Sequence, residues 1–114
     1  MKVCDLPYRR VTLEEIEKVM KDVIARVKNA KSADEVLAAR QDYLALQSDY
    51  QTAASLSYMR YSINTVDEFY VAEKDYYDEI GPAAYNLKIE YEEALLDSPF
   101  RAELEKALLP LLFK

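Results

Sequence analysis

After residue 12, the hydrophobic residues of the chain follow the spacing of an amphipathic helix. Apolar residues recur there every three or four positions, which places them on one face of a helix. The segment Thr12-Leu13-Glu14-Glu15 is a capping box, in which the threonine hydroxyl accepts from the third backbone N–H. We therefore predict a helix over about 13–30, after an extended lead-in that contains Pro7. The stripe consists of Leu13, Ile16, Met20, Val23, Val27 and Ala30.

A second capping box, Ser32-Ala33-Asp34-Glu35, precedes a longer apolar stripe. No glycine or proline interrupts the chain between this box and Gly81. The pattern predicts a helix over about 33–62, roughly 45 Å long at 1.5 Å per residue. The stripe has Val36, Tyr43, Tyr50 and Ser57 seven residues apart, with Ala39, Leu46 and Ala53 between them.

A third capping box, Thr65-Val66-Asp67-Glu68, precedes another heptad pattern, and Gly81-Pro82 falls inside it. Proline within a helix removes a hydrogen bond and clashes with the preceding turn. Because the heptad phase is the same before and after Pro82, we favour one kinked helix over about 66–97, while a break into two helices stays open. The pattern has Tyr70, Tyr77, Ala84 and Tyr91 seven residues apart, interleaved with Ile80, Leu87 and Ala94.

Ser98-Pro99 predicts a fourth helix over about 99–109, with proline at its first position. An apolar cluster around Pro110 follows, and such a cluster at a chain end needs a surface to bury it. We expect either a second copy of the chain, in a homodimer, or downstream sequence to cover it. The cluster contains Leu108, Leu109, Leu111, Leu112 and Phe113.

Together these patterns predict an all-α fold, an antiparallel bundle of long helices in a single domain over residues 1–114. The composition agrees, because the chain of 114 residues is 51% hydrophobic and contains one glycine. Scarce glycine argues against hairpins and sandwiches, whose turns need positive φ.

The charge of the chain narrows its partners. Fifteen lysines and arginines against 21 aspartates and glutamates give a net charge of −6, which disfavours nucleic acid and an anionic membrane surface. No window is long and apolar enough to span a membrane, and the N-terminus does not read as a signal peptide. Cys4 is the one cysteine, so no internal disulfide forms. We expect a cytoplasmic location.

Catalytic chemistry has little support in the residues. The chain has no histidine and one glycine, which excludes a Ser-His-Asp triad, a His-Glu-x-x-His zinc pair and a glycine-rich phosphate loop. No catalytic, cofactor-binding or metal-binding residue is therefore predicted. Cys4 is interpreted as inert, and Arg9-Arg10 as surface charge rather than an anion site. Six acids that could share a site are instead expected on solvated faces: Glu14, Glu17, Glu68, Asp75, Asp78 and Glu79.

Tyrosine is unusually frequent, with ten in the chain. Nine of them fall in the two long predicted helices. The favoured interpretation is a half-buried seam, since a tyrosine ring can pack while its hydroxyl stays wet. The functional alternative is that some line a groove for an extended peptide. The candidates for such lining are Tyr58, Tyr61, Tyr70 and Tyr77.

Four segments resemble the N-terminal region of the oligoendopeptidase F-like zinc metallopeptidases, relatives of thimet oligopeptidase. The first is Asn29-Ala30-Lys31-Ser32-Ala33-Asp34-Glu35 and the second is Arg60-Tyr61-Ser62-Ile63-Asn64-Thr65-Val66-Asp67-Glu68-Phe69-Tyr70. The third is Glu73-Lys74-Asp75-Tyr76-Tyr77-Asp78-Glu79 and the fourth is Ala94-Leu95-Leu96-Asp97-Ser98-Pro99-Phe100-Arg101. The resemblance covers nearly the whole chain, although none of these segments is a catalytic signature.

The resemblance implies that this chain is the N-terminal fragment of a longer peptidase. Such enzymes hold zinc on a His-Glu-x-x-His helix in their C-terminal half and hydrolyse short peptides with a zinc-activated water. The implied role of this region is a non-catalytic helical lobe that shapes and restricts a substrate channel. Its implied partners are the missing C-terminal catalytic domain and oligopeptides.

Two rival hypotheses stay open at this stage. One is a free-standing helical interaction module that self-associates through its apolar C-terminal end. The other is a helical bundle that binds iron or manganese through carboxylates alone.

Overall fold

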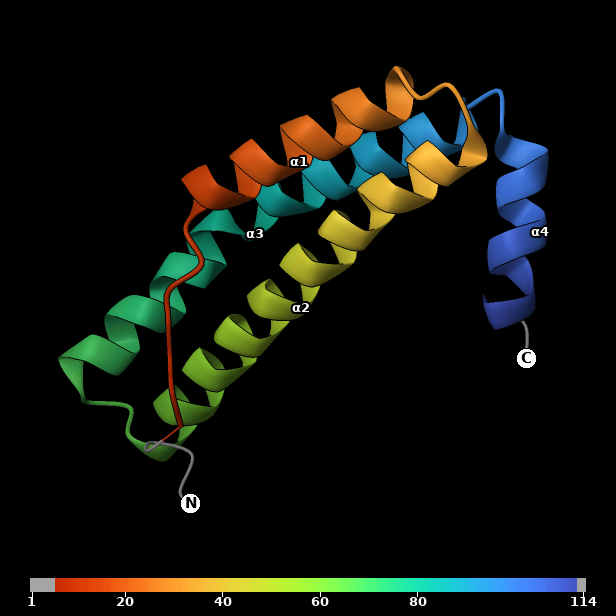
Figure 1. Cartoon of the computed structure of the whole chain (residues 1–114). Helices are drawn as coiled ribbons and strands as arrows, with labels where there is room; N and C mark the ends of the chain where they lie inside the picture. Colours follow the sequence, from red (N-terminus) through yellow and green to blue (C-terminus); the bar gives the residue numbers. More distant parts are fainter. Residues whose placement is uncertain (1–5, 113–114) are drawn as a thin grey trace.

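The computed structural model describes residues 6–112, and side chains up to Leu108. This part of the chain is all-α. Its helices are α1 (Leu13–Lys28), α2 (Ala33–Ile63), α3 (Glu68–Leu96) and α4 (Arg101–Leu112) (Figure 1). The predicted fold class and the four predicted helices are confirmed, with shifts at several helix ends.

The caps of the first two predicted boxes, Thr12 and Ser32, are confirmed, while the carboxylate of Glu15 accepts from Arg9 at 2.9 Å. The backbone N–H of Glu15 donates to the hydroxyl of Thr12 at 3.2 Å, and that of Glu35 donates to Ser32 at 3.3 Å. The carboxylate of Glu35 reaches back and accepts from the backbone N–H of Lys31 at 3.0 Å. These bonds satisfy N–H groups that have no partner within the helix, which fixes where α1 and α2 begin.

The third capping box is wrong, because Asp67 and not Thr65 caps α3. One carboxylate oxygen of Asp67 accepts from the backbone N–H groups of Phe69 at 2.9 Å and Tyr70 at 3.1 Å. Helix α3 therefore begins at Glu68, two residues later than predicted. The four-residue spacing of a capping box fitted Thr65, but an aspartate nearer the helix is an equally strong cap.

Two other boundaries differ from the prediction. Helix α1 ends at Lys28 rather than residue 30, with Asn29 as its C-terminal cap. The turn after α3 includes Pro99, and the hydroxyl of Ser98 accepts from the backbone N–H of Phe100 at 3.1 Å. Helix α4 therefore begins at Arg101, later than the predicted 99, and continues to Leu112.

Helix α3 is continuous through Gly81-Pro82, as the unbroken heptad phase predicted. Proline has no N–H, so the carbonyl of Asp78 lacks its usual partner four residues on. Pro82 is exposed, so water can reach that side of the helix. The apolar face of α3 therefore stays in register, with Tyr77, Ile80 and Tyr91 all buried.

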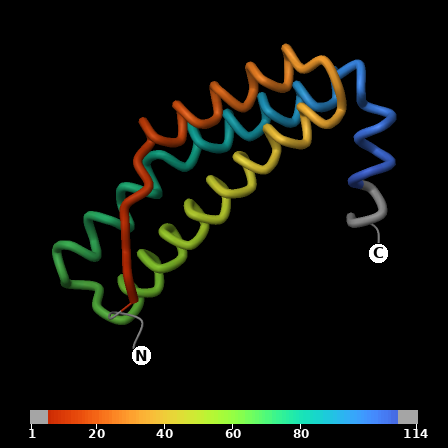
Figure 2. The backbone as a smooth tube through the Cα atoms, viewed as in Figure 1, coloured from red at the N-terminus to blue at the C-terminus, as the bar shows by residue number. Residues whose placement is uncertain are grey.

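The helices form an elongated bundle of 51 × 30 × 19 Å. From α1 to α3, consecutive helices run antiparallel, so α1 and α3 point the same way and pack side by side (Figure 1). Helix α1 has 16 residues against the 31 of α2, so it covers only part of the pair formed by α2 and α3. The lead-in from Leu6 to Thr12 crosses the remaining part (Figure 2).

The core joins α1, α2 and α3, and tyrosines form part of it. The rings of Tyr43 in α2 and Tyr91 in α3 stack with centroids 4.2 Å apart, and Tyr50 meets Tyr77 edge-on at 6.0 Å. These pairs form the predicted seam between the long helices, but it is buried more deeply than the predicted half-buried seam, since Tyr43, Tyr77 and Tyr91 are 8%, 2% and 1% exposed. The most deeply buried aliphatic residues include Val11, Val23, Val27, Val36 and Ala39.

Helix α4 stands at one end of the bundle, where it packs against α2 (Figure 1). Leu104 is its buried contact with the core. Most of the predicted apolar cluster around Pro110, from the side chain of Leu109 onward, lies outside the described residues. The homodimer through that end stays a prediction.

Candidate functional site

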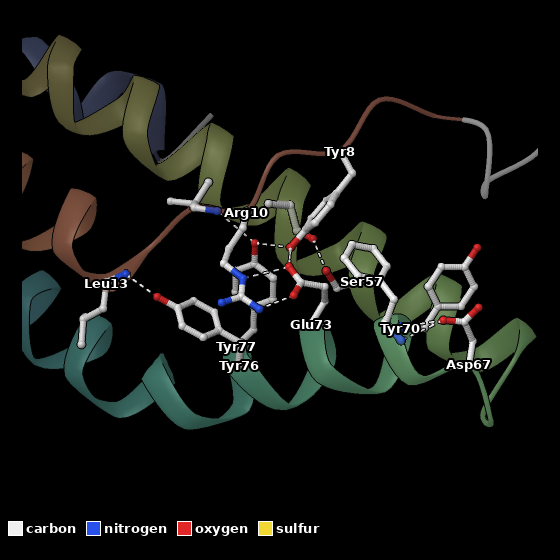
Figure 3. A network of polar contacts seen from close by, with 12 residues as sticks. Tyr8, Arg10, Leu13, Ser57, Asp67, Tyr70, Glu73, Tyr76 and Tyr77 are labelled. Carbon is white, nitrogen blue, oxygen red and sulfur yellow. Dashed lines mark hydrogen bonds and ion pairs between the residues drawn. The ribbon is translucent and has the colours of Figure 1, made fainter.

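A polar network joins the lead-in to α3 (Figure 3). Its centre is Glu73, whose side chain is 7% exposed. The carboxylate accepts from the hydroxyl of Tyr8 at 2.6 Å and from Nε of Arg10 at 2.9 Å. Nη2 of Arg10 also donates to the second carboxylate oxygen, which makes the pair bidentate. A buried charge is thus matched by a charged partner and a neutral donor.

Two tyrosine hydroxyls of α3 extend the network to the backbone. The hydroxyl of Tyr77 accepts from the backbone N–H of Val11 at 3.1 Å, and it lies 2.8 Å from the hydroxyl of Tyr8. The hydroxyl of Tyr76 accepts from the backbone N–H of Leu13 at 2.8 Å. A segment without regular structure otherwise leaves its N–H groups unpaired, so these bonds stabilise the lead-in on α3.

Arg60 ties down the start of the described chain. Its Nη2 donates to the backbone carbonyl of Leu6 at 2.7 Å. Its guanidinium lies 5.3 Å from the ring centroid of Tyr8 and 5.9 Å from that of Tyr70, within cation–π range. The lead-in is therefore held by α2 as well as by α3.

The network shifts two pKa values in opposite directions. The hydrogen bonds from Arg10 lower the pKa of Glu73 below its ordinary value, with a further contribution from Tyr8. Burial raises the pKa of Tyr8, and its hydrogen bond to Glu73 raises it further. The carboxylate stays charged and the phenol stays neutral at neutral pH. Groups in these protonation states hold the lead-in on α3 and do not transfer a proton. We call Tyr8, Arg10 and Glu73 the clasp.

A second cluster lies on the surface where α2 meets α3. The hydroxyl of Tyr58 donates to the carboxylate of Asp78, and this bond raises the pKa of Tyr58 to about 12. Nζ of Lys74 lies 3.0 Å from the other oxygen of Asp78 and 5.0 Å from the ring centroid of Tyr61. We call Tyr58, Tyr61, Lys74 and Asp78 the surface tyrosine cluster.

The four tyrosines proposed for peptide lining thus occupy different environments. Tyr58 is 39% exposed, and Tyr61 and Tyr70 are half-buried. Tyr77 is 2% exposed, and its hydroxyl belongs to the network around Glu73. Tyr77 therefore has almost no surface to offer a peptide, whereas Tyr58 and Tyr61 lie together on one face.

Four network residues were not among the sequence candidates: Tyr8, Arg10, Glu73 and Tyr76. Glu73 follows Tyr70 by three positions and precedes Tyr77 by four, which places it on the buried face of α3. An acid on an apolar stripe is a signal that a basic partner is needed. Arg10 is that partner, so the interpretation of Arg9-Arg10 as plain surface charge holds only for Arg9, which pairs with Glu15 at 2.9 Å.

An apolar crevice of about 280 Å³ lies beside Gly81. Met20 and Leu46 form part of its wall, and its polar members include Gln47, Gln51 and Lys88. Its lining comes from α1, α2 and α3 and includes the small residues Gly81 and Ala84.

Within residues 6–112, no three Cys, Asp or Glu side chains lie close enough to hold a metal ion. Of the six candidate acids, Asp75 and Asp78 both contact Lys74, at 3.5 Å and 3.0 Å. Cys4 lies outside the described residues. No helix in the described part has the length and apolar character needed to cross a membrane.

Three solved structures are similar to this chain in fold and sequence. A structure described as oligoendopeptidase F shares 34% identity at a TM-score of 0.90, over 99% of this chain and 20% of that one. PZ peptidase A with an inhibitor shares 33% identity at a TM-score of 0.90, over 98% and 20%. An oligoendopeptidase F from Bacillus anthracis str. Ames shares 33% identity at a TM-score of 0.86, over 91% and 19%. This chain spans about one fifth of their length.

Family models give the same relationship, while a comparison with curated proteins gave no match. The model of the peptidase M3 N-terminal domain matches residues 4–114, which include the clasp around Glu73 and the surface tyrosine cluster. The chain therefore belongs to the family of peptidase M3 N-terminal domains.

Proposed function

We propose that this chain is the non-catalytic N-terminal lobe of a zinc metallopeptidase related to oligoendopeptidase F, and that it shapes the channel through which short peptides enter. The observation that carries the proposal is the match of residues 4–114 to the peptidase M3 N-terminal domain. The similar structures support it, because this fold occupies about a fifth of each of those longer chains.

Zinc would be held elsewhere in the parent protein. This chain has no histidine, and its described residues offer no cluster of three acidic or cysteine side chains. Zinc sites of peptidases use His and Glu ligands with one open position for water. We therefore assign no ligand and no catalytic step to this chain. We also propose a cytoplasmic location for the parent, in keeping with a single cysteine.

The surface tyrosine cluster is the part of the lobe that we assign to the channel wall. Tyr58 and Tyr61 present aromatic surface, and Asp78 and Lys74 hold them in place. Tyrosine offers large contact area at low entropic cost, with a hydroxyl for peptide amides. Tyr70 lies beside Phe69 and Arg60 and completes the set.

The proposal is tested first on the reading frame that contains this chain. We expect it to continue past Lys114 and to encode a His-Glu-x-x-His helix. A stop codon at that point would contradict the proposal and favour the rival, a self-associating module.

Kinetics of the complete protein test the channel assignment. Tyr61→Ala and Tyr58→Ala are expected to lower kcat/KM for short peptides several-fold through KM, because they remove ground-state binding. The control is Tyr85→Ala, which removes an exposed tyrosine elsewhere on α3. Equal kcat/KM in all variants would remove the surface tyrosine cluster from the channel.

A further inference from the structure

An exposed apolar surface covers the turn between α2 and α3. We call it the apolar tip and define it as Met59, Ile63, Val66 and Phe69, which are 46%, 64%, 84% and 54% exposed. Most of the exposed large hydrophobic side chains in the described part of the chain lie between residues 58 and 69. Exposed apolar side chains gathered around one turn of the chain mark a candidate interaction site. The tip lies at the end of the bundle opposite α4 (Figure 1).

Hydrogen bonds fix the backbone of the tip, although its side chains are exposed to solvent. The side-chain oxygen of Asn64 accepts from the backbone N–H groups of Val66 and Asp67, both at 3.2 Å. Asp67 then caps α3. The ring of Tyr8 meets Phe69 edge-on at 6.3 Å. A surface preorganised in this way loses little conformational entropy when it binds.

Resting on the proposed function, we propose that the apolar tip is the surface on which the remaining polypeptide of the parent peptidase docks. In the similar structures about four fifths of each chain lies outside the matched region, since this chain covers 20% of them. The fold itself is retained there at a TM-score of 0.90. The additional chain adjoins a lobe of this fold, and the tip holds four of the seven exposed large hydrophobic side chains in the described part of the chain.

A second copy of this chain is a poorer occupant. A two-fold dimer brings the same surface of both copies together. At the tip this would place Asp67 and Glu68 of one copy close to the same residues of the other, in chains that each carry a net charge of −6. Like charges at an interface disfavour association. A partner with an apolar pocket and basic or neutral edges fits better.

If polypeptide docks at the tip, the surface tyrosine cluster lies beside the docked chain. Tyr58 and Tyr61 flank Met59 in the last turns of α2. Polypeptide that covers the tip would border the cluster and leave its tyrosines at the junction of the two parts. A channel between two lobes is lined at such a junction.

Amide hydrogen exchange compares the tip in two contexts, the 114-residue chain and the complete protein encoded by its reading frame. We expect exchange of the amides between residues 63 and 70 to be at least about tenfold slower in the complete protein, because docking removes their local opening. Exchange near Leu96, which is 54% exposed and distant from the tip, serves as the internal control.

Charged variants give a second, independent measurement. Ile63→Glu with Val66→Glu is expected to lower the Tm of the complete protein by several degrees and to leave that of the 114-residue chain unchanged. Leu96→Glu is the matched control, with comparable exposure at the other end of α3. The comparison of the two contexts separates lost docking from lost folding.

The outcomes separate this proposal from the proposed function. An active peptidase whose tip exchanges at the same rate in both contexts would overturn the docking proposal alone. A complete protein that hydrolyses no short peptide would overturn the proposed function, while slow exchange at its tip would still support docking. A dimer of the 114-residue chain that the tip variant dissociates would assign the tip to a second copy instead.

Discussion

Nε of Arg10 donates a 2.9 Å hydrogen bond to the carboxylate of Glu73, 63 residues later in the chain. This contact fixes the lead-in across the part of the bundle that α1 does not reach. The guanidinium of Arg10 also lies 4.1 Å from the ring centroid of Tyr76, whose hydroxyl binds the backbone of Leu13. One ion pair is thus coupled to the start of α1.

Removing the carboxylate should destabilise the fold. Glu73→Ala leaves the Tyr8 hydroxyl and the Arg10 guanidinium without their acceptor, and we expect a loss of about 2 kcal/mol in the free energy of unfolding. This loss is smaller than is usual when one partner of a buried ion pair is removed, because Arg10 is 39% exposed and water can solvate its guanidinium. Urea denaturation of the 114-residue chain measures it.

The control for this variant is Arg9→Gln. Arg9 pairs with Glu15, and both side chains are substantially exposed, at 60% and 37%. Surface pairs contribute little to stability, so the denaturation midpoint should not move. Equal effects of the two variants would mean that Glu73 acts as an ordinary surface charge.

Acid should weaken the same contact. The folded pKa of Glu73 is lowered, chiefly by Arg10, so the contribution of Glu73 is complete above its unfolded pKa of about 4.3 and is lost as the pH falls through the folded pKa. The stability difference between the natural chain and Glu73→Gln should therefore shrink below about pH 4. Urea midpoints between pH 3 and 6 test this, and a difference that is constant with pH would contradict it.

Alkali should destabilise the chain through its buried phenols. Burial raises the pKa of Tyr8, Tyr43, Tyr50 and Tyr91. A raised folded pKa means that stability is complete below the unfolded value, about 10 for tyrosine, and falls as the pH rises beyond it. We expect urea midpoints to decrease above about pH 10, with phenolate absorbance appearing as the chain unfolds. Tyr8→Phe should reduce the steepness of that decrease.

Two substitutions test which residue of the motif Thr65-Val66-Asp67-Glu68 caps α3. Asp67→Ala removes the acceptor of two backbone N–H groups and should cost about 1 kcal/mol in the free energy of unfolding. Thr65→Ala removes no bond to the helix and should be close to neutral. Circular dichroism during denaturation measures both, and a larger loss for Thr65→Ala would restore the original capping box.

Local sequence patterns predicted the helices well, because the start and the apolar face of a helix depend on residues close in the chain. The hydroxyls of Thr12 and Ser32 bond three residues ahead, and the heptad phase carried α3 across Pro82. The motif does not distinguish Thr65 from Asp67 as the cap of α3, since both residue types are good caps.

The clasp depended on contacts that no local pattern contains. Tyr8 and Arg10 lie more than 60 residues from Glu73, and only the packing of three helices brings them together. Glu73 on the apolar face of α3 signals a buried acid, but it does not identify the partner. The same limit applies to Tyr77, whose heptad position fits either a seam or a channel until its burial is known.

Gly81 and Pro82 should affect stability together rather than separately. Apart from its chain neighbours and the backbone of its own helix, a Cβ at Gly81 would meet no atom within 4 Å, and the φ of Gly81 is not positive. Alanine therefore fits the space and should gain about 0.5–1 kcal/mol from its higher helix propensity. The residue before a proline, however, is disfavoured in helical conformation when it carries a Cβ. We expect Gly81→Ala to give the full gain in a Pro82→Ala background and little or none in the natural chain.

A double-mutant cycle by urea denaturation measures this difference in the free energy of unfolding. Equal gains in both backgrounds would show that Pro82 does not explain why the chain places its single glycine at position 81.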